Sequence, residues 1–333
     1  MKNKNAILLI TVFFLLIFWG QTAICSAQQH IGIKKQSVDS NSSMVIVCPS
    51  FLRPCIEELL RVAQEKKICN SLVFKYQSDT RSLKRGNVIH IVLEQDLDAK
   101  CSIKDPKTAK GQQAATAPMS PECLVLGSLG ICLYANCSNP LKGLTIPQID
   151  AIFSEDRRCG FPFTIDYFSQ LGLTGAWLDT PVAPFAKSPN PDLYTWVKKS
   201  CLCGGSFRSD VKLLPTKADL FHAVSTQQGA LGLYLCGEKI EGIKTVAISK
   251  KEGDDYVEAS SQNITARAYP LSARLIAYFD SKGVGDEGTR FLRFCISLEG
   301  QKILSSYNVF PAYPKGFKGK RLPLVEAPTK STP

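Results

Sequence analysis

Apolar and polar residues follow two patterns along this chain, and each pattern predicts one kind of secondary structure. Short apolar runs bounded by small or polar residues predict buried strands, whereas apolar residues three or four positions apart predict amphipathic helices. The stretch 131–154 combines both, with an Asn-Cys-Ser-Asn-Pro turn between them. Thr145 is the expected N-cap of its helix, and Pro147 suits the first helical turn. The stretch therefore predicts one strand–helix unit of an α/β protein.

Strands and helices of this kind succeed each other along most of the chain. We expect strands at 44–48, 72–76, 88–93, 131–134, 181–186, 229–235, 244–249 and 271–278, the fifth of them at a sheet edge. We expect helices at 56–63, 146–153, 193–199, 219–224 and 287–305, with Asn190 and Pro191 opening the third. The alternation of strands with helices predicts sheets that are mainly parallel and covered by helices.

Small or polar residues follow the carboxyl ends of the first three predicted strands. Ser50 follows the first strand, Ser78 and Thr80 follow the second, and the run 94–96 follows the third. In open parallel sheets, ligands bind beyond these strand ends, where hydroxyl groups and helix N-termini face a crevice. The three hydroxyl residues are therefore candidate ligands, although each suits a helix cap or a turn equally well.

The first residues of the chain are typical of an export signal. Two lysines precede the apolar run 6–19, and small residues follow it. The run is shorter than the roughly 20 apolar residues that a transmembrane helix needs. Cleavage after Ala27 is the preferred interpretation. Lipidation of Cys25 is the second and an uncleaved membrane anchor the third. Residues 28–43 are polar without periodicity and are expected to form a flexible leader.

Composition limits the class of protein and of partner. The 333 residues are 44% hydrophobic, which is enough for a globular core in one large or two medium domains. The net charge of +11 falls to +9 without residues 1–27, which favours anionic partners. Apart from the segment 315–321, the lysines are dispersed and no aromatic nucleic-acid motif accompanies them. A solvated basic surface is the preferred interpretation, and no nucleic-acid partner is expected.

Cysteine usage agrees with export. Of 13 cysteines, Cys25 falls in the signal segment and twelve remain, an even number that suits disulfides in an exported protein. Spacing does not give the pairing, but Cys132 with Cys137, or Cys48 with Cys55, are candidates. The alternative is a metal or redox site at the close pair 201/203. With three histidines in the chain and no Cys-x-x-Cys motif, we expect structural cysteines and no metal or cofactor.

Four segments together resemble a known family in their order and spacing. They are Asn-Pro-Leu-Lys-Gly-Leu-Thr-Ile-Pro-Gln-Ile-Asp-Ala-Ile-Phe-Ser at 139–154, Gly-Ala-Leu-Gly-Leu-Tyr at 229–234, Tyr-Pro-Leu-Ser-Ala-Arg-Leu-Ile-Ala-Tyr at 269–278, and 291–303 followed by Phe310-Pro311. The chain from 45 to 313 resembles the phosphate-binding components of bacterial ABC importers, which are PstS-like type II periplasmic binding proteins.

The resemblance implies a fold, a division into lobes and a function. It implies an α/β protein of two lobes, each with a mainly parallel sheet flanked by helices, joined by two crossover connections at a hinge. Lobe I would comprise 44–130 and 268–314, and lobe II 131–267. The segment 315–333 that follows is a basic tail rich in proline and lysine, a composition that predicts a loose tail. Such a protein is periplasmic or associated with the cell envelope, is expected to be a monomer, and delivers a small anionic solute to a membrane permease. It performs no catalysis.

The resemblance also places ligand residues on four loops. Ser50 and Phe51 match the first loop, and Ser78 matches the second, with Asp79 and Thr80 beside it. Gln95 or Asp96 takes the place of the third. In the fourth, Lys187 and Asp192 stand where the family has an arginine and a Ser-Gly-Thr helix start.

The fourth loop departs most from the family pattern. Pro191 lacks the N–H group that an oxyanion would use, and Asp192 adds a negative charge at the same place. Glu94 and Asp79 add two further carboxylates. A phosphate-like anion is the first expected ligand. The alternatives are an exported scaffold or interaction protein with a lost or changed ligand, and a redox enzyme at Cys201 and Cys203.

Overall fold

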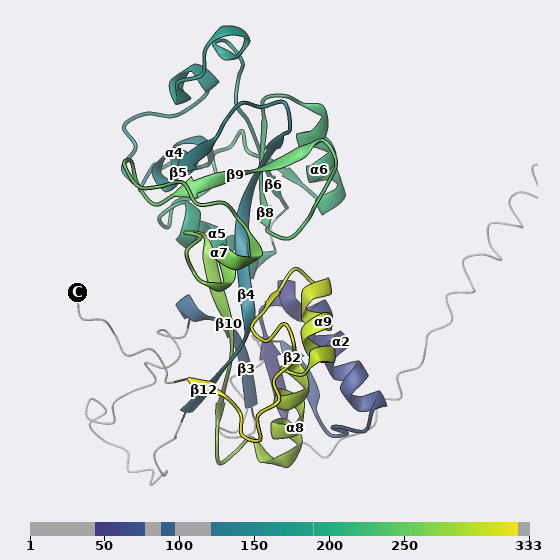
Figure 1. Ribbon diagram of the computed structural model, residues 1–333. Coiled ribbons are helices and arrows are strands. Elements are labelled where there is room, and N and C mark those ends of the chain that lie inside the picture. Colours follow the sequence, from purple (N-terminus) through teal and green to yellow (C-terminus); the bar gives the residue numbers. More distant parts are fainter. Residues whose placement is uncertain (1–43, 77–87, 97–120, 189, 326–333) are drawn as a thin grey trace, which may run out of the picture. The chain divides into compact units, whose positions relative to one another are not determined.

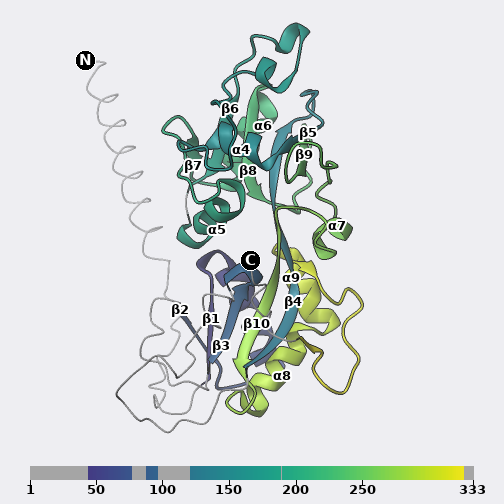
Figure 2. The same ribbon diagram turned by 90° about the vertical axis from the view of Figure 1, so that its left-hand side faces the viewer.

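The strand β4 (Pro121–Asn136) holds most of the sheet structure together. The computed structural model describes residues 44–76, 88–96, 121–188 and 190–325, and within them β4 carries strand partners on both edges. Its first part pairs with β10 (Ser272–Asp280), and its last part pairs with β8 (Ala230–Leu235). Figures 1 and 2 show β4 running from one group of strands into the other.

The first group of strands is half parallel and half antiparallel. Its order is β2-β1-β3-β10-β4, and the first three strands are parallel: β1 (Val45–Cys48), β2 (Val73–Tyr76) and β3 (Val88–Leu93). Two short strands, β11 (Phe310–Pro311) and β12 (Leu324–Val325), pair with the other edge of β4. Three helices pack against one another in this part: α2 (Arg53–Glu65), α8 (Gly285–Cys295) and α9 (Leu298–Ser306).

The second group of strands repeats this mixed arrangement. Its order is β4-β8-β6-β7, in which β6 (Ala183–Lys187), β7 (Lys212–Leu214) and β8 are parallel. On the other edge, β9 (Ile243–Ser249) pairs with β4 and with β5 (Gly143–Thr145). The accompanying helices are α4 (Ile146–Phe153), α5 (Pro191–Cys201), α6 (Lys217–Thr226) and α7 (Ser261–Thr265), with 3-10 turns η5 (Phe168–Leu171) and η6 (Gly175–Trp177).

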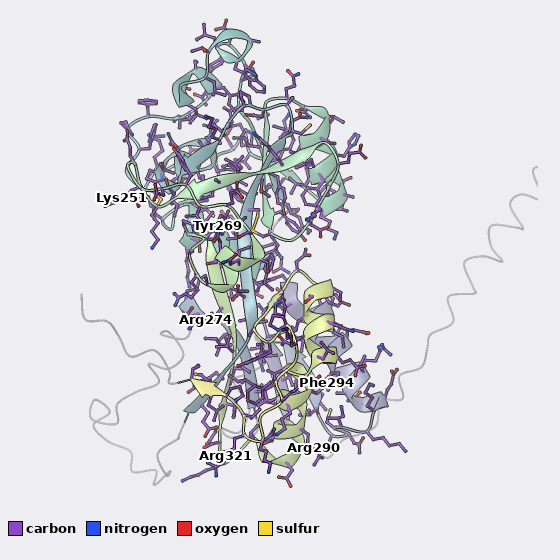
Figure 3. All side chains as sticks on the ribbon, in the orientation of Figure 1. Lys251, Tyr269, Arg274, Arg290, Phe294 and Arg321 are labelled. Carbon is purple, nitrogen blue, oxygen red and sulfur yellow. A yellow bond between two sulfur atoms is a disulfide. The ribbon has the colours of Figure 1, made fainter. Side chains whose placement is uncertain are left out.

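The chain passes between the two groups at two adjacent places. The Ile131 N–H in β4 donates to the Leu271 carbonyl at 2.9 Å, just before β10. The Tyr269 hydroxyl donates to the Ile131 carbonyl at 3.0 Å, and its ring is buried beside β4 (Figure 3). Burial raises the pKa of Tyr269 well above its usual value, so this hydroxyl remains a hydrogen-bond donor at physiological pH.

Most of the predicted elements form, and their caps are as expected. Thr145 caps α4 with a full capping box: its side chain accepts from the Gln148 N–H at 3.2 Å, and the Gln148 side chain accepts from the Thr145 N–H. The strand predicted at 181–186 is not an edge strand, however. As β6 it lies between β7 and β8, because its N–H and C=O groups find parallel partners on both sides.

The single helix predicted at 287–305 is two helices. Ser297 interrupts it as the N-cap of α9, where its side chain accepts from the Gly300 N–H at 3.2 Å. Gly300 lies against the end of α8, so that a Cβ on it would meet the carbonyl oxygen of Phe294 and, at 2.9 Å, the Cα of Cys295. The apolar periodicity continues through this break, which is why it predicted one helix.

The described part of the basic tail is anchored to the body. The Phe317 N–H donates to the Ile296 carbonyl at 2.8 Å, and the Arg293 guanidinium donates to the Gly319 carbonyl at 3.3 Å. Strand β12 then pairs with β4. The expectation of a loose tail is therefore wrong for residues 315–325, because backbone pairing and one arginine hold them. Residues 326–333 and the predicted leader segments 1–27 and 28–43 lie outside the described residues.

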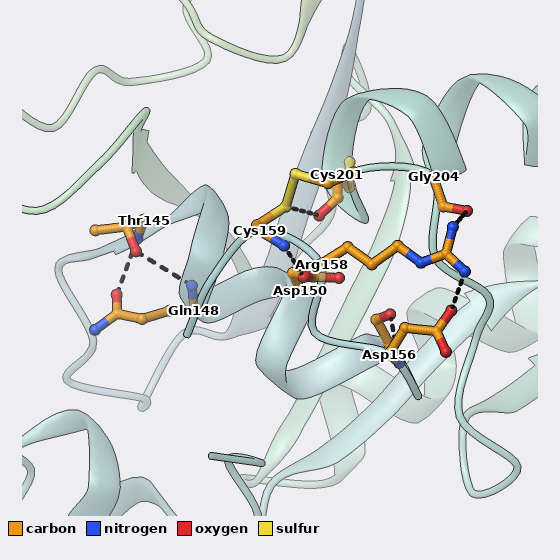
Figure 4. The surroundings of a disulfide bond; sticks show 10 residues. Thr145, Gln148, Asp150, Asp156, Arg158, Cys159, Cys201 and Gly204 are labelled. Carbon is orange, nitrogen blue, oxygen red and sulfur yellow. Dashed lines mark hydrogen bonds and ion pairs between the residues drawn. A yellow bond between two sulfur atoms is a disulfide. The ribbon is translucent and has the colours of Figure 1, made fainter. Parts of the chain in front are cut away.

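The described residues contain two disulfides, and neither is a pair suggested by spacing. They join Cys132 in β4 to Cys236, which directly follows the neighbouring strand β8, and Cys159 to Cys203 (Figure 4). Cys48, Cys55 and Cys137, which the spacing offered as partners, are free thiols. Sequence spacing missed the true pairs because each bond joins segments that are distant in the chain, 104 and 44 residues apart.

The candidate redox pair is not a dithiol. Cys203 is bonded to Cys159, and Cys201 is a separate, buried thiol. Burial raises the pKa of Cys201, whereas a reactive cysteine requires a lowered one. The alternative of a redox centre at Cys201 and Cys203 is therefore wrong. Within the described residues, no helix combines the length and the apolar character needed to span a membrane.

Prediction for the helix break. We expect Gly300→Ala to destabilise the fold by about 1–3 kcal/mol, because the new methyl group meets backbone atoms of α8 that cannot yield as a side chain does. Helix propensity alone would favour alanine by about 1 kcal/mol. Urea denaturation measures the change, with Lys302→Ala on the exposed face of α9 as the control. Equal or greater stability of Gly300→Ala would contradict this account.

Prediction for a buried carboxylate. Asp150 is fully buried, one of its oxygens accepts from the Cys159 N–H at 2.6 Å (Figure 4), and burial raises its pKa. The folded state therefore binds this proton more tightly than the unfolded chain, and stability is lost as pH rises above about 4. We expect Asp150→Asn to gain stability relative to the native protein over that range.

The matched control has the opposite sign. A side-chain hydrogen bond from Arg208 lowers the pKa of Asp210, so Asp210→Asn should lose stability relative to the native protein as pH rises. Urea denaturation at a series of pH values measures both variants. Parallel pH profiles for Asp150→Asn and the native protein would refute the assignment.

Candidate functional site

The first predicted ligand loop follows β1 directly. Pro49 ends the strand in an extended conformation, and the 3-10 turn η1 (Ser50–Leu52) begins at Ser50. Leu52 is buried under this turn, which leaves Ser50 and Phe51 partly exposed. The N–H and hydroxyl of Ser50 are thus presented at the carboxyl end of a parallel strand, as the sequence predicts.

The fourth predicted loop leads from β6 into α5. Lys187 is the last residue of β6, and Asn190 is the N-cap of α5. The Asn190 side chain accepts from the N–H groups of Asp192 at 3.2 Å and Leu193 at 3.4 Å. Pro191 occupies the first helical position, where it has no N–H to offer. The N–H groups at this helix start are therefore already satisfied within the chain.

These two loops meet through Ser50 and Asp192. The Ser50 N–H donates to Asp192 Oδ2 at 2.6 Å. The Ser50 hydroxyl lies 2.6 Å from the same carboxylate oxygen and 2.8 Å from Asn190 Oδ1, and its one hydrogen can serve one of them at a time. Hydrogen bonds to a charged acceptor are the stronger kind, so the carboxylate is the favoured partner. An anionic oxygen thus accepts both donors of Ser50.

Two further contacts link the same helix to the first group of strands. Trp196 and Ser200 follow Asp192 at intervals of four residues, so the three share one face of α5. The Trp196 ring stacks on Phe51, with ring centroids 6.3 Å apart and planes inclined by 18°. The Ser200 hydroxyl donates to Gln95 Oε1 at 3.4 Å. One helix face therefore contacts the turns that follow both β1 and β3.

The third predicted loop is the turn η3 (Glu94–Asp96). Gln95 Nε2 is buried there and has no hydrogen-bond partner among the described residues. Glu94 pairs with Arg267 at 3.1 Å and lies 3.8 Å from Arg274. The charge of Glu94 is therefore balanced by two guanidinium groups, which removes it as a repulsive group for an anion.

Lys187 faces a small cavity beside the helix start. Its volume of about 20 Å³ has room for about one water molecule. Besides Lys187 and Asn190, the cavity is lined by Ile131, Ala186, Leu193, Tyr194, Val197, Phe207, Leu233 and Tyr234. In this arrangement of the chain, the space beside the lysine is mostly apolar and is too small for a polyatomic anion.

The structure brings together part of the predicted site. Ser50, Phe51 and Gln95 all contact α5, and Asp192 binds Ser50 directly. Asp96 ends the η3 turn. The second predicted loop, with Ser78, Asp79 and Thr80, lies outside the described residues.

Three residues of the site were not predicted. The sequence marks Asn190 only as a helix cap and gives no role to Trp196 or Ser200. The signal that could have found the last two is their spacing, since 192, 196 and 200 recur every four residues along a predicted helix. No comparable signal reveals that Asn190 reaches Ser50. Within the described ranges, no group of three or more His, Cys, Asp or Glu side chains is arranged to hold a metal ion.

Comparison with known sequences supports the resemblance over part of the chain. The phosphate-binding proteins PstS of two Pseudomonas aeruginosa strains are each 35% identical to this chain over 184 residues. The match covers 54% of this chain and 57% of the relative, so the chain spans somewhat more than half the length of these curated relatives. No model of a protein family matches the chain.

Solved structures extend the likeness to the fold of most of the chain. A possible phosphate binding protein from Planctomyces limnophilus is similar with a TM-score of 0.61 at 16% identity, over 81% of this chain and 93% of that one. An ABC-type phosphate transport receptor from Vibrio cholerae gives 0.57 at 15% identity, over 80% and 99%. PstS from Borrelia burgdorferi gives 0.56 at 13% identity, over 81% and 98%.

These comparisons confirm two expectations from the sequence. The chain is similar in sequence to PstS proteins, and it has the mixed α/β fold of type II periplasmic binding proteins. Each group has a parallel part, formed by β1, β2 and β3 in one and by β6, β7 and β8 in the other, whereas the strand pairs made by β4 and β10 are antiparallel.

Prediction for the contact between the loops. In a double-mutant cycle, we expect Ser50→Ala and Asp192→Ala to show a coupling energy in unfolding of at least about 1 kcal/mol. The reason is that the hydroxyl of a partly buried serine, which alanine lacks, donates to a carboxylate. Urea denaturation of the two single variants and the double variant measures this energy.

The matched control pairs Ser50→Ala with Asp286→Ala. Asp286 is exposed at the second position of α8, as Asp192 is at the second position of α5. These two changes should be additive within about 0.5 kcal/mol. Additivity of the Ser50 and Asp192 changes would show that the contact does not contribute to stability.

Proposed function

We propose that this chain is the solute-binding component of an ABC-type importer, with phosphate or a related oxyanion as its ligand. The observation that carries the proposal is the Ser50 turn, where a main-chain N–H and a hydroxyl converge on one anionic oxygen. Carboxylate and phosphate oxygens accept hydrogen bonds of the same geometry and charge-assisted strength. The turn therefore has the chemistry of an oxyanion site, and the similarity to PstS proteins favours phosphate.

The proposed ligand lies between two lobes. Lobe I comprises 44–130 and 268–314, and lobe II comprises 131–267, so that Ser50 and Gln95 come from the first lobe and Lys187 from the second. The two passages of the chain near Ile131 and Tyr269 are the proposed hinge. Closure of the lobes would bring the Lys187 cation and the Ser50 donors to the same anion.

The proposed setting is outside the cytoplasm. Residues 1–27 would direct export and be removed after Ala27. In the alternative, lipidation of Cys25, the segment 28–43 would link the folded part to the envelope surface. The partner would be the membrane permease of the importer. The protein would act as a monomer, without cofactor and without catalysis, since solute binding and release need no bond to be made or broken.

A second function is favoured by one specific observation. Asp192 already fills the acceptor position at Ser50, so the chain has a contact that joins the two loops without any solute. A protein that has lost or changed its ligand, and that serves as an exported scaffold or interaction protein, would keep such a contact. The two functions differ in whether an oxyanion binds.

Prediction for ligand binding. We expect inorganic phosphate to bind the purified protein and to raise its unfolding temperature. At 100 times Kd, the gain is about 2.7 kcal/mol. Ser50→Ala should weaken binding about tenfold, because it removes one donor to the anion. Isothermal titration calorimetry measures the affinity, and Ser306→Ala, an exposed serine in α9, serves as the control.

The outcome that rejects the transport function is the absence of binding. If phosphate, sulfate and molybdate all leave the unfolding temperature unchanged, the scaffold function is the better account. Neutral solutes, tested in the same series, report a changed ligand class.

A further inference from the structure

We infer that the Asp192 carboxylate is an internal competitor of the solute anion, and that Asp192 is the residue that limits the affinity of this site. The inference rests on the proposed function, because it concerns the same Ser50 turn. It goes further by assigning Asp192 a role opposed to that of a ligand residue.

The Asp192 carboxylate occupies both donors of Ser50. The N–H and the hydroxyl of Ser50 both lie 2.6 Å from Asp192 Oδ2. A solute oxyanion cannot use either donor while the carboxylate is in place. The hydroxyl can turn to Asn190 Oδ1 at 2.8 Å, but that partner is also within the chain.

The helix start on the other side of the contact offers no donor in place of Ser50. The N–H groups of Asp192 and Leu193 are held by Asn190 Oδ1, the Tyr194 N–H donates to the Asn190 carbonyl at 2.9 Å, and Pro191 has no N–H. The first turn of α5 therefore has no N–H group to offer to a solute. Displacing Asp192 from Ser50 is the change that exposes donors for an anion.

The charge of Asp192 also opposes binding of a solute anion. A solute anion that approached Ser50 with Asp192 still in place would meet a carboxylate at hydrogen-bond range of the same donors. Like charges at such a distance repel strongly in a partly buried site, where water screens them less than in bulk. The solute and Asp192 therefore exclude each other, which is competition for a single position.

More than one contact holds α5 in the position where Asp192 competes with a solute. Trp196 stacks on Phe51, and the Ser200 hydroxyl donates to Gln95, both from the α5 face that carries Asp192. Together these contacts keep α5 against the turns after β1 and β3. A solute binds only the undocked state. Its apparent affinity is therefore its affinity for that state multiplied by the fraction of molecules that are undocked.

The test is calorimetric titration of the full chain with inorganic phosphate. We expect Asp192→Ala to bind phosphate at least about tenfold more tightly than the native protein, because the competing acceptor and its charge are both removed. Asp192→Asn keeps the shape and removes the charge, so it should lie between the two. Asp286→Ala, the same change at the same position of α8, should match the native protein.

A second measurement reports the contact without any solute. In phosphate-free protein, hydrogen exchange of the Ser50 amide should be faster in Asp192→Ala than in the native protein, since that amide loses its acceptor. Circular dichroism checks that each variant is folded. If Asp192→Ala does not fold, Asp192→Asn carries the titration, because it removes the competing charge while its amide oxygen can still accept from Ser50.

The outcomes separate this inference from the proposed function. Tighter phosphate binding by Asp192→Ala than by the native protein, with Asp286→Ala unchanged, upholds it. Equal or weaker binding by Asp192→Ala, while the native protein binds phosphate, overturns the inference and leaves the proposed function standing. An unchanged Ser50 exchange rate also overturns it. Absence of binding by every variant overturns the proposed function itself.

Discussion

The pairing of β4 on both edges is the constraint on which the rest of the fold depends. A strand must satisfy N–H and C=O groups on two sides, and β4 does so with different partners in its two parts: β10, β11 and β12 along the first, β8 and β9 along the second. Gly127 allows β11 to approach, since a Cβ there would meet the Phe310 carbonyl at 2.7 Å. The disulfide from Cys132 to Cys236 fixes β8 to the same strand. Each parallel group is thereby held in register with one continuous backbone.

The parts of the fold that could be predicted from the sequence are those set by local chemistry. Thr145 with Gln148, and Asn190 with Pro191, mark helix starts because the groups that satisfy the first N–H donors are within four residues. The predictions that were wrong depend on distant partners. The β6 strand is interior because β7 and β8 flank it, and the 287–305 helix is broken because Gly300 packs on α8. No periodicity within a segment carries that information.

The predictions about the candidate site show the same difference between local features and distant partners. Position in the chain was sufficient to predict that Ser50 and the run 94–96 follow parallel strands, whose carboxyl ends gather at one edge of a sheet. It was also sufficient to show that Asp192 brings a negative charge to a helix start. It was not sufficient to show where that charge goes, since the partner at Ser50 is 142 residues away. Glu94 is the converse case: its sequence position predicts repulsion of an anion, whereas Arg267 and Arg274 balance it.

At the start of α5, the stability of the helix and the binding of an oxyanion depend on the same groups. Asn190 caps the helix, Pro191 fits the first position without loss, and the Asp192 carboxylate is favoured by the helix dipole, so each residue stabilises α5. The same three residues leave its first N–H groups satisfied or absent, and an oxyanion site requires those groups to be free. The carboxylate that stabilises the helix also reaches Ser50 and holds its two donors. Stabilisation of the helix start and closure of the site to a solute are therefore one arrangement of atoms, and a change that opens the site must weaken the end of the helix.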